Sequence, residues 1–358
     1  MMGLYSPLDG MQSPFGARRK NLFDRVMDLE PFGMWDFGAA GFQTPGLEPT
    51  ATGAPVGLGL DLSQGVRLSS DQIYGLGPEL WDNAAVQTNG AAEILGNGRF
   101  RIYSPNNDYS SIFIPNTLTP GVSYLFSYTI EHVAAGVVRA GNTGINRSSV
   151  GVHRELLTPE NQSAYMKRQD FSGNGTDIIV SGISIREIPG NHFVTGNIPQ
   201  SPTLDAAGAL DFDGLDDQIA VSVAALTDAH IFLALDTVDS IGILFAPEAA
   251  GSGNHLGAWS NSTSDIAGGA GVASVKVDGQ PAADRAELRE TLLAPGAHFV
   301  EVSASNLAGW SELWLSGYAG WRVDGQFSPR IYIHDNANGP LTDHNRALIE
   351  RWVTEGLS

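Results

Sequence analysis

Four aspartates lie within seven residues in the segment DFDGLDD, which spans residues 211–217. Carboxylates gathered on a loop are the ligands that Ca²⁺ prefers, so Asp213, Asp216 and Asp217 are candidate metal ligands. Their spacing differs from the EF-hand loop, which needs a ligand at its twelfth position and more donors in between. Because Asp-Gly is also an ordinary turn dipeptide, we favour a structural turn over a calcium site and expect no cofactor.

The remaining reactive residues form no known catalytic pattern. The chain has no cysteine, and therefore no thiol nucleophile or cysteine-bound zinc. Its eight histidines lack the spacing of a zinc motif, and GWSEL at residues 309–313 lacks the second glycine of a GxSxG elbow. A glycosidase needs two carboxylates about 5 to 10 Å apart, and the sequence selects no such pair. We therefore expect a protein that is not an enzyme.

Aromatic side chains are the other group that could bind a ligand, because their flat faces stack on sugar rings. At strand spacing Trp310 and Trp314 share one face, and the neighbouring leucines take the other. Most tryptophans in a β-sandwich are buried, so a core position is the competing interpretation for each of them. Trp81 and Tyr103 are further candidates under the same alternative. The main candidate glycan-binding residues are Trp259, Trp310, Trp321, Tyr318 and Tyr109.

The composition indicates which elements position these residues. Only 16% of the 358 residues are charged, against roughly 25% in an average globular protein, and 43 glycines and 19 prolines supply many turns. This balance favours β-structure. The net charge is −19 with only three lysines, which argues against nucleic acid as a partner. No apolar run approaches the ~20 residues of a membrane span, so we expect no membrane insertion.

The alternating pattern within residues 51–190 predicts a first antiparallel β-sandwich, in the form of a jelly roll. The segments RFRIYS, SIFIP and VSYLFSYTIE alternate apolar and polar residues, as half-buried strands do, and their inward residues include Phe100, Ile112 and Phe126. The segment DIIVSGISIREI then places Ile179, Ile183 and Ile185 on one face of a closing strand, which Pro189 ends.

Residues 191–358 predict a second sandwich. The segment ALDFDGLDDQIAVSV reads as a hairpin that turns at Asp213-Gly214 and faces Leu210 and Ile219 inward. Further Asp-Gly turns are expected at residues 278–279 and 324–325.

A single C-terminal helix is expected over residues 342–355. Thr342 suits its N-cap, Gly356 suits its C-terminal cap, and one apolar stripe would pack on the sheets. The stripe consists of Leu348, Ile349, Trp352 and Val353.

Residues 1–50 differ from the rest, because proline and glycine recur every few residues and no period is sustained. Such a segment buries its own apolar groups poorly, so its aromatic residues must pack on something else. We interpret it as an arm for attachment and oligomerisation, and a tail that wraps over its own domain is an equal alternative. The candidate docking residues are Phe15, Arg18, Arg19, Phe23 and Trp35.

The strand alternation breaks off at PGNH, residues 189–192, and this break could close an active site or join two modules. Loops of such composition are mostly connectors. We therefore interpret residues 189–197 as the junction between the two sandwiches.

The segments ISIREIPGNH and ALDFDGLDDQI together resemble a junction in fibre and spike proteins of bacteriophages and gene transfer agents, between a carbohydrate-binding-like jelly roll and a concanavalin or laminin-G-like domain. SVKVDGQPA and RIYIHDNANGPLTDHNRALIERWV resemble a hairpin and the closing strand plus helix of laminin-G-like domains, and YSPLDGMQSPFGARRK resembles the N-terminal pieces of such virion proteins. Laminin-G-like domains often bind Ca²⁺, but no position here matches their calcium pattern.

The resemblance implies a virion protein, assembled in the bacterial cytoplasm and then extracellular. Its expected partners are capsid or tail proteins, further copies of itself in a symmetric homo-oligomer, and bacterial surface polysaccharide. One alternative is a structural adaptor or decoration protein that binds no glycan. A polysaccharide-cleaving spike ranks last, because no β-helical repeat is visible.

Overall fold

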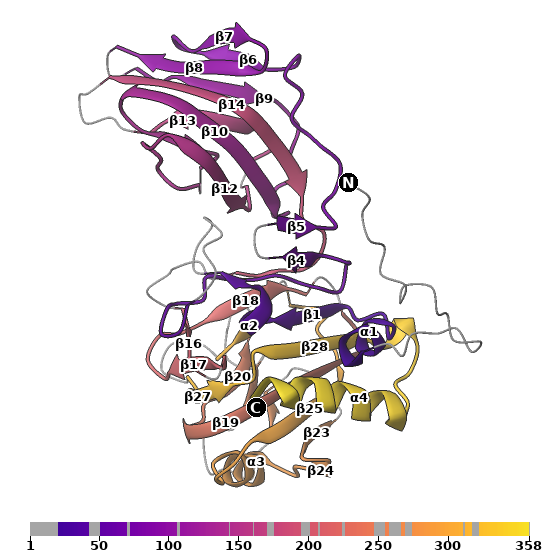
Figure 1. Cartoon of the computed structure of the whole chain (residues 1–358). Coiled ribbons are helices and arrows are strands. Elements are labelled where there is room, and N and C mark those ends of the chain that lie inside the picture. Colours follow the sequence, from indigo (N-terminus) through magenta and orange to yellow (C-terminus); the bar gives the residue numbers. More distant parts are fainter. Residues whose placement is uncertain are drawn as a thin grey trace, which may run out of the picture.

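The chain folds into two antiparallel β-sandwiches that follow each other along the sequence and lie end to end (Figure 1). This confirms the expected fold class. The computed structural model describes residues 21–42, 51–69, 72–105, 108–142, 144–159, 161–169, 175–194, 201–206, 208–223, 226–246, 255–257, 266–268, 274–310, 312–316 and 322–357. No helix within these ranges is long and apolar enough to cross a lipid bilayer.

The first sandwich consists, in the described residues, of a five-stranded and a four-stranded sheet. The larger sheet has the order β12 (Gly151–Leu157), β10 (Tyr124–Ala135), β14 (Thr176–Glu187), β8 (Arg99–Ser104) and β7 (Glu93–Gly96). The smaller sheet has the order β11 (Val138–Ala140), β13 (Ala164–Arg168), β9 (Ser111–Ile114) and β6 (Gln87–Asn89). The predicted inward residues Phe100, Ile112 and Phe126 are buried in one core between the sheets.

The prediction for Ile179 is wrong, and a β-bulge explains why. Gly182 has a φ of +57°, and the pairing of β10 with β14 shifts by one residue around it. An extra residue in one strand reverses the alternation beyond it. The buried residues of β14 are therefore Ile178 and Val180 before the bulge, and Ile183 and Ile185 after it.

The second sandwich has two larger sheets in the described residues. One has the order β2 (Gly41–Phe42), β3 (Leu58–Gly59), β15 (Phe193–Val194), β18 (Ile219–Ser222), β26 (Glu312–Leu315), β20 (Ile243–Ala246), β21 (His255–Gly257) and β22 (Ala267–Gly268). The other has the order β16 (Thr203–Leu204), β17 (Leu210–Asp213), β27 (Asp324–Phe327), β19 (Ala229–Ser240), β25 (His298–Ser305), β23 (Ser274–Val277) and β24 (Gln280–Pro281). In this second sheet β28 (Arg330–Asp335) pairs with β19 and with β1 (Gly33–Asp36).

Two of the predicted turns need correction. Strands β17 and β18 do not form a hairpin, because β17 pairs with β16 and β27 while β18 joins the opposite sheet. The loop after Asp213 therefore crosses from one sheet to the other. Asp324 and Gly325 lie inside β27 in extended conformation, paired with β17, and make no turn. The turn at Asp278-Gly279 is confirmed, since both residues have positive φ between β23 and β24.

The C-terminal helix α4 (Asp343–Thr354) is confirmed, with the side chain of Thr342 accepting from the backbone N–H of Asn345 at its N-cap. Its apolar stripe packs on the outer face of the sheet that contains β19. Gly356 lies in the 3₁₀ turn Glu355–Leu357, where a Cβ atom would stand 2.7 Å from Oγ of Ser328. Close approach, and not a left-handed cap, is what requires glycine there.

Three helices were not expected: α1 (Leu22–Met27), α2 (Phe37–Ala40) and α3 (Arg285–Leu292). The start of α3 has a signal in the sequence, an aspartate followed three residues later by a glutamate. Asp284 accepts from the N–H of Glu287, while the carboxylate of Glu287 accepts from the N–H of Ala283, one residue before the N-cap, in a variant of the capping box.

The described part of the N-terminal segment is not a free arm. Strand β1 pairs with β28, helix α1 contacts α4, and Trp35 is fully buried in the core of the second sandwich. Because β3 joins the same sandwich, residues 21–42 and 58–59 belong to it, and the expected boundary at residue 51 is wrong. The alternative interpretation, a tail that packs on its own domain, holds for this part.

The two sandwiches meet at the segment that ends β14, as expected of a junction. Ile188 packs in a small cluster with Leu125 and Leu156 of the first sandwich and with Leu60 and Leu62, which directly follow β3. The hairpin of β4 (Arg67–Ser69) and β5 (Gln72–Tyr74) lies between the sandwiches (Figure 1).

Candidate functional site

The outward face of the four-stranded sheet in the first sandwich carries the best-formed candidate site. In β13 the inward residues Ala164 and Met166 are buried, so Tyr165 and Lys167 between them point outward. In β9 the buried Ile112 and Ile114 turn Phe113 outward in the same way.

Strand register gathers these outward residues into two rows. Residues directly opposite each other in an antiparallel pair share a face, with Cβ atoms about 5 Å apart. One row consists of Gln87, Phe113 and Tyr165. The next row consists of Asn89, Ser111, Lys167 and Arg139.

Three aromatic rings surround a shallow hollow of about 330 Å³ on this face, which we call the aromatic hollow. Tyr109 is 44% exposed, and Phe113 and Tyr165 are half-buried. The aromatic hollow is lined by Asn89, Tyr109, Ser111, Phe113, Asn142, Asn161, Ser163, Tyr165 and Lys167.

A glycine positions Tyr109 at the edge of the aromatic hollow. Gly90, directly after β6, has a φ of +67°, and a Cβ atom there would stand 2.0 Å from the carbonyl oxygen of Tyr109. Only glycine allows the two backbones to approach this closely. The sequence therefore fixes the Tyr109 backbone against the end of β6.

The polar groups of the aromatic hollow are held in place by their neighbours. Nζ of Lys167 donates to Oδ1 of Asn142 at 2.8 Å and lies 5.4 Å from the centre of the Tyr165 ring. Nδ2 of Asn161 donates to the Tyr165 hydroxyl at 3.5 Å, while its Oδ1 accepts from the N–H of Ser163. Burial lowers the pKa of Lys167, and the nearby charge of Arg139 lowers it further.

This arrangement suits the binding of a sugar ring. Aromatic faces flanked by amides, hydroxyls and an ammonium group match the apolar faces and hydroxyl edges of a sugar ring. No aspartate or glutamate is among the described residues that line the aromatic hollow, so it lacks the carboxylate pair of a glycosidase.

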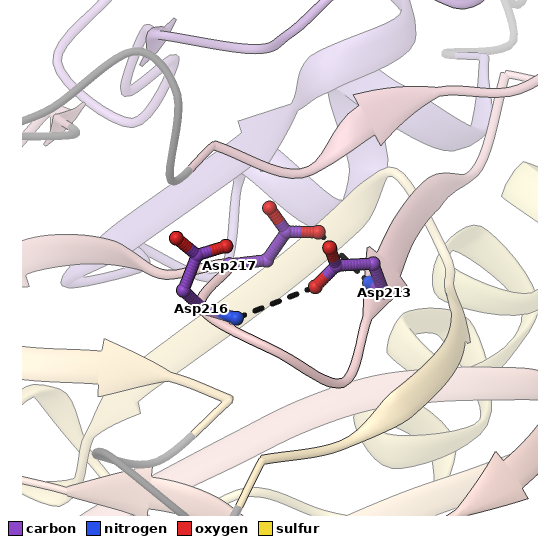
Figure 2. Close-up of side chains that lie close together, drawn as sticks. All are labelled: Asp213, Asp216 and Asp217. Atoms are coloured by element: carbon purple, nitrogen blue, oxygen red, sulfur yellow. Dashed lines mark hydrogen bonds between the residues drawn. The ribbon is translucent and has the colours of Figure 1, made fainter.

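The aspartate loop after β17 is a second candidate site. Figure 2 shows Asp213, Asp216 and Asp217 around one point, and their nearest carboxylate oxygens lie within 4.8 Å of one another. The N–H of Asp213 donates to Oδ2 of Asp217 at 2.8 Å, and Oδ1 of Asp213 accepts from the N–H groups of Leu215 and Asp216. The carboxylates therefore hold the loop together.

Asp217 is the buried member of the three aspartates. Burial raises its pKa to about 6, and the charges of Asp213 and Asp216 raise it too, against a hydrogen bond from the Asp213 backbone and the charge of Arg322. A Ca²⁺ ion needs six to eight oxygen ligands, and the turn already engages one oxygen of Asp213 and one of Asp217. The three carboxylates alone do not complete such a shell, and calcium binding stays an untested alternative to the structural turn.

The structure changes the assignment of several predicted residues. Trp310 is only 5% exposed and packs in the core of the second sandwich; it lies in the turn before β26, where the alternation of a strand does not apply. Trp81 is buried in the first core. Trp314 does point outward, but its indole N–H donates to Glu312. Tyr103 is half-buried beneath the guanidinium of Arg101, outside the aromatic hollow.

The structure also changes the assignment of the predicted docking residues. Trp35 is fully buried, so it cannot contact a partner, and its indole N–H donates to the carbonyl of Asn191. Phe23 is half-buried in α1. The other predicted residues lie outside the described ranges: Phe15, Arg18, Arg19, Trp259, Tyr318 and Trp321.

Of the predicted glycan-binding residues, Tyr109 lies in the aromatic hollow. Sequence reasoning missed Phe113, Tyr165 and Lys167. A signal for the first two existed, since each is an aromatic residue at the outward position of an alternating strand. That they meet on one face depends on strand pairing.

No family model matches the chain, and no curated protein matches its sequence. Among solved structures, the chain is similar to the N-terminal CBM22-1-CBM22-2 tandem domain of Xyn10C from Paenibacillus barcinonensis, at 8% identity and a TM-score of 0.28, over 78% of this chain and 95% of that one. It is also similar to a glyoxylate-induced protein from Pseudomonas aeruginosa, at 12% identity and a TM-score of 0.13, over 85% and 98%. Such scores carry no argument about function.

Proposed function

We propose that this chain binds polysaccharide through the aromatic hollow of its first sandwich. The observation that carries the proposal is the meeting of Tyr109, Phe113 and Tyr165 around one open hollow with amide, hydroxyl and ammonium groups. A monomeric domain rarely exposes such a cluster without a ligand or partner for it. The protein acts as a binding module and cleaves nothing.

The resemblance of its sequence to fibre and spike proteins supports a finer proposal, in which the chain is displayed on a virus particle and attaches it to host surface polysaccharide. In this proposal the first 20 residues, together with further copies of the chain, connect it to capsid or tail proteins. Localisation is then the virion, reached after assembly in the bacterial cytoplasm.

Binding is tested with the full chain and purified bacterial surface polysaccharides on a glycan array, followed by calorimetry. Tyr109→Ala should weaken binding about tenfold or more, as truncation of a central aromatic contact does. Tyr74→Ala is the matched control, because Tyr74 is also an exposed tyrosine but lies in β5, away from the aromatic hollow. Equal binding by both variants and the parent would refute the proposal.

Attachment is tested by deleting residues 1–20 only. A deletion of residues 1–50 would remove β1 and the buried Trp35, and would therefore confuse attachment with folding. The shorter deletion should leave the chain folded and polysaccharide binding intact while the chain is lost from particles. Normal incorporation into particles would contradict the attachment role.

A structural adaptor remains the second candidate, because apolar side chains are exposed at both edges of the five-stranded sheet. Val152 in β12 and Ile94 in β7 are 68% and 53% exposed. Unpaired edge strands with apolar side chains favour contacts between subunits. Sedimentation of the parent and of Val152→Lys separates the two roles: loss of oligomers with polysaccharide binding retained would assign this edge to assembly.

A further inference from the structure

Two cations lie next to each other on the face that carries the aromatic hollow. Lys167 in β13 and Arg139 in β11 are directly opposite in register, so both side chains leave the sheet on the same side. Lys167 lines the aromatic hollow, and Arg139 extends the same row beyond it.

Neither cation has a carboxylate partner among the described residues. Two other arginines of this sandwich do have such partners, Arg99 with Glu131 and Arg101 with Asp177. Lys167 instead donates to the neutral amide of Asn142, and Nε of Arg139 is buried without a hydrogen-bond acceptor in the described structure. The chain has 39 acidic and only 20 basic residues, so two adjacent cations without a carboxylate partner in the described structure form a local excess of positive charge.

Within the part of the chain that the structure describes, few hydrogen-bond acceptors engage these two groups. An ammonium group has three hydrogen-bond donors, and the contact with Asn142 uses one of them. A guanidinium has five donors in a planar fork that matches a carboxylate. Burial and the charge of Arg139 both oppose the charged form of Lys167, and an anion between the two cations would relieve this repulsion.

We propose that the aromatic hollow binds an acidic polysaccharide, with a uronic acid carboxylate held between Lys167 and Arg139. This inference rests on the proposed polysaccharide binding. Tyr165 and Lys167 are two residues apart on one strand, about 7 Å along it. A sugar ring placed against Tyr165 therefore brings the carboxyl group at its rim within reach of Lys167.

The test compares polygalacturonate with the same polymer after reduction of its carboxyl groups to neutral hydroxymethyl groups. The full chain should bind polygalacturonate at least tenfold more tightly, and this advantage should shrink as sodium chloride is raised. Lys167→Gln should weaken binding of polygalacturonate far more than binding of the reduced polymer and so remove most of the advantage, whereas Lys167→Arg should retain it. Lys276→Gln, which removes the same charge from the second sandwich, is the control.

The outcomes separate this inference from the proposed function. Equal affinity for the native and the reduced polymer, with both affinities lowered by Tyr109→Ala, would overturn the acidic ligand and leave polysaccharide binding in place. Tighter binding of dextran sulfate than of polygalacturonate would overturn the carboxylate assignment. If Tyr109→Ala leaves the affinity for both polymers unchanged, both proposals are overturned.

Discussion

The backbone N–H of Asp61 donates a 3.0 Å hydrogen bond to Nδ1 of His192. Nε2 of His192 lies 3.1 Å from the carbonyl of Ile188, so the ring is neutral, with its proton on Nε2. The buried carboxylate of Asp61 accepts from the N–H groups of Met34 and Asn191. One pair of residues thus connects the N-terminal segment to the junction between the sandwiches.

Acid should weaken this connection. Burial lowers the pKa of His192 from 6.5 to about 4, so the folded chain holds fewer protons on this residue than the unfolded chain between these values. His192 therefore contributes stability that is present above pH 6.5 and is lost as the pH falls toward 4, by up to about 3 kcal/mol. Urea unfolding of the parent and of His192→Gln at pH 7 and pH 4.5 measures it. The variant should lose this part of the pH dependence, and an identical slope in both proteins would contradict the assignment.

Trp35→Ala should strongly destabilise the second sandwich. The indole is fully buried, meets the Phe193 ring edge-on at 4.7 Å between centres, and donates to the carbonyl of Asn191. Removing a buried tryptophan costs about 3 to 5 kcal/mol. Chemical denaturation measures the loss. Leu215→Ala, at a side chain that is 77% exposed, should change stability by less than about 0.5 kcal/mol.

Gly90→Ala should weaken polysaccharide binding without touching a ligand directly. The new methyl group would overlap the carbonyl oxygen of Tyr109 and push that residue away from the aromatic hollow. Gly96→Ala is the matched control, because Gly96 also has a positive φ but has no atom within 4 Å of the new methyl position. Both variants lose about 1 kcal/mol of stability because alanine is placed in the left-handed region. A difference between their affinities for polysaccharide, measured by calorimetry, therefore reports the displacement of Tyr109. Equal affinities would exclude it.

Asp217→Asn should stabilise the fold above pH 6. The pKa of Asp217 is raised to about 6, so the folded state prefers the protonated carboxyl, and stability falls as the pH rises from about 4 to 6. The asparagine variant should avoid this loss, which amounts to up to about 3 kcal/mol, and keep an acceptor for the N–H of Asp213. Thermal unfolding with and without Ca²⁺ decides between turn and ion site. A melting temperature that rises with Ca²⁺ in the parent but not in the variant would identify a calcium ligand.

Local patterns were sufficient to predict much of the fold. Alternation identified Phe100, Phe126 and Leu210 as inward residues, and capping chemistry identified the start of α4 at Thr342. Both follow from residues within a few positions of each other. The prediction failed at Gly182, where one extra residue exchanges the inward and outward positions of β14. Such a bulge depends on the partner strand as well as on the sequence of β14 itself.

Strand partners and the binding face came only from the tertiary structure. Strands β17 and β18 follow each other in the sequence and still lie in opposite sheets, because burial of their apolar faces is satisfied equally by pairing together or by facing each other across a core. The aromatic hollow is assembled from residues 89 to 167. The sequence alone determined that Tyr109 was a candidate, and the pairing of β9 with β13 decided that Phe113 and Tyr165 join it, since register is a property of two strands and not of one.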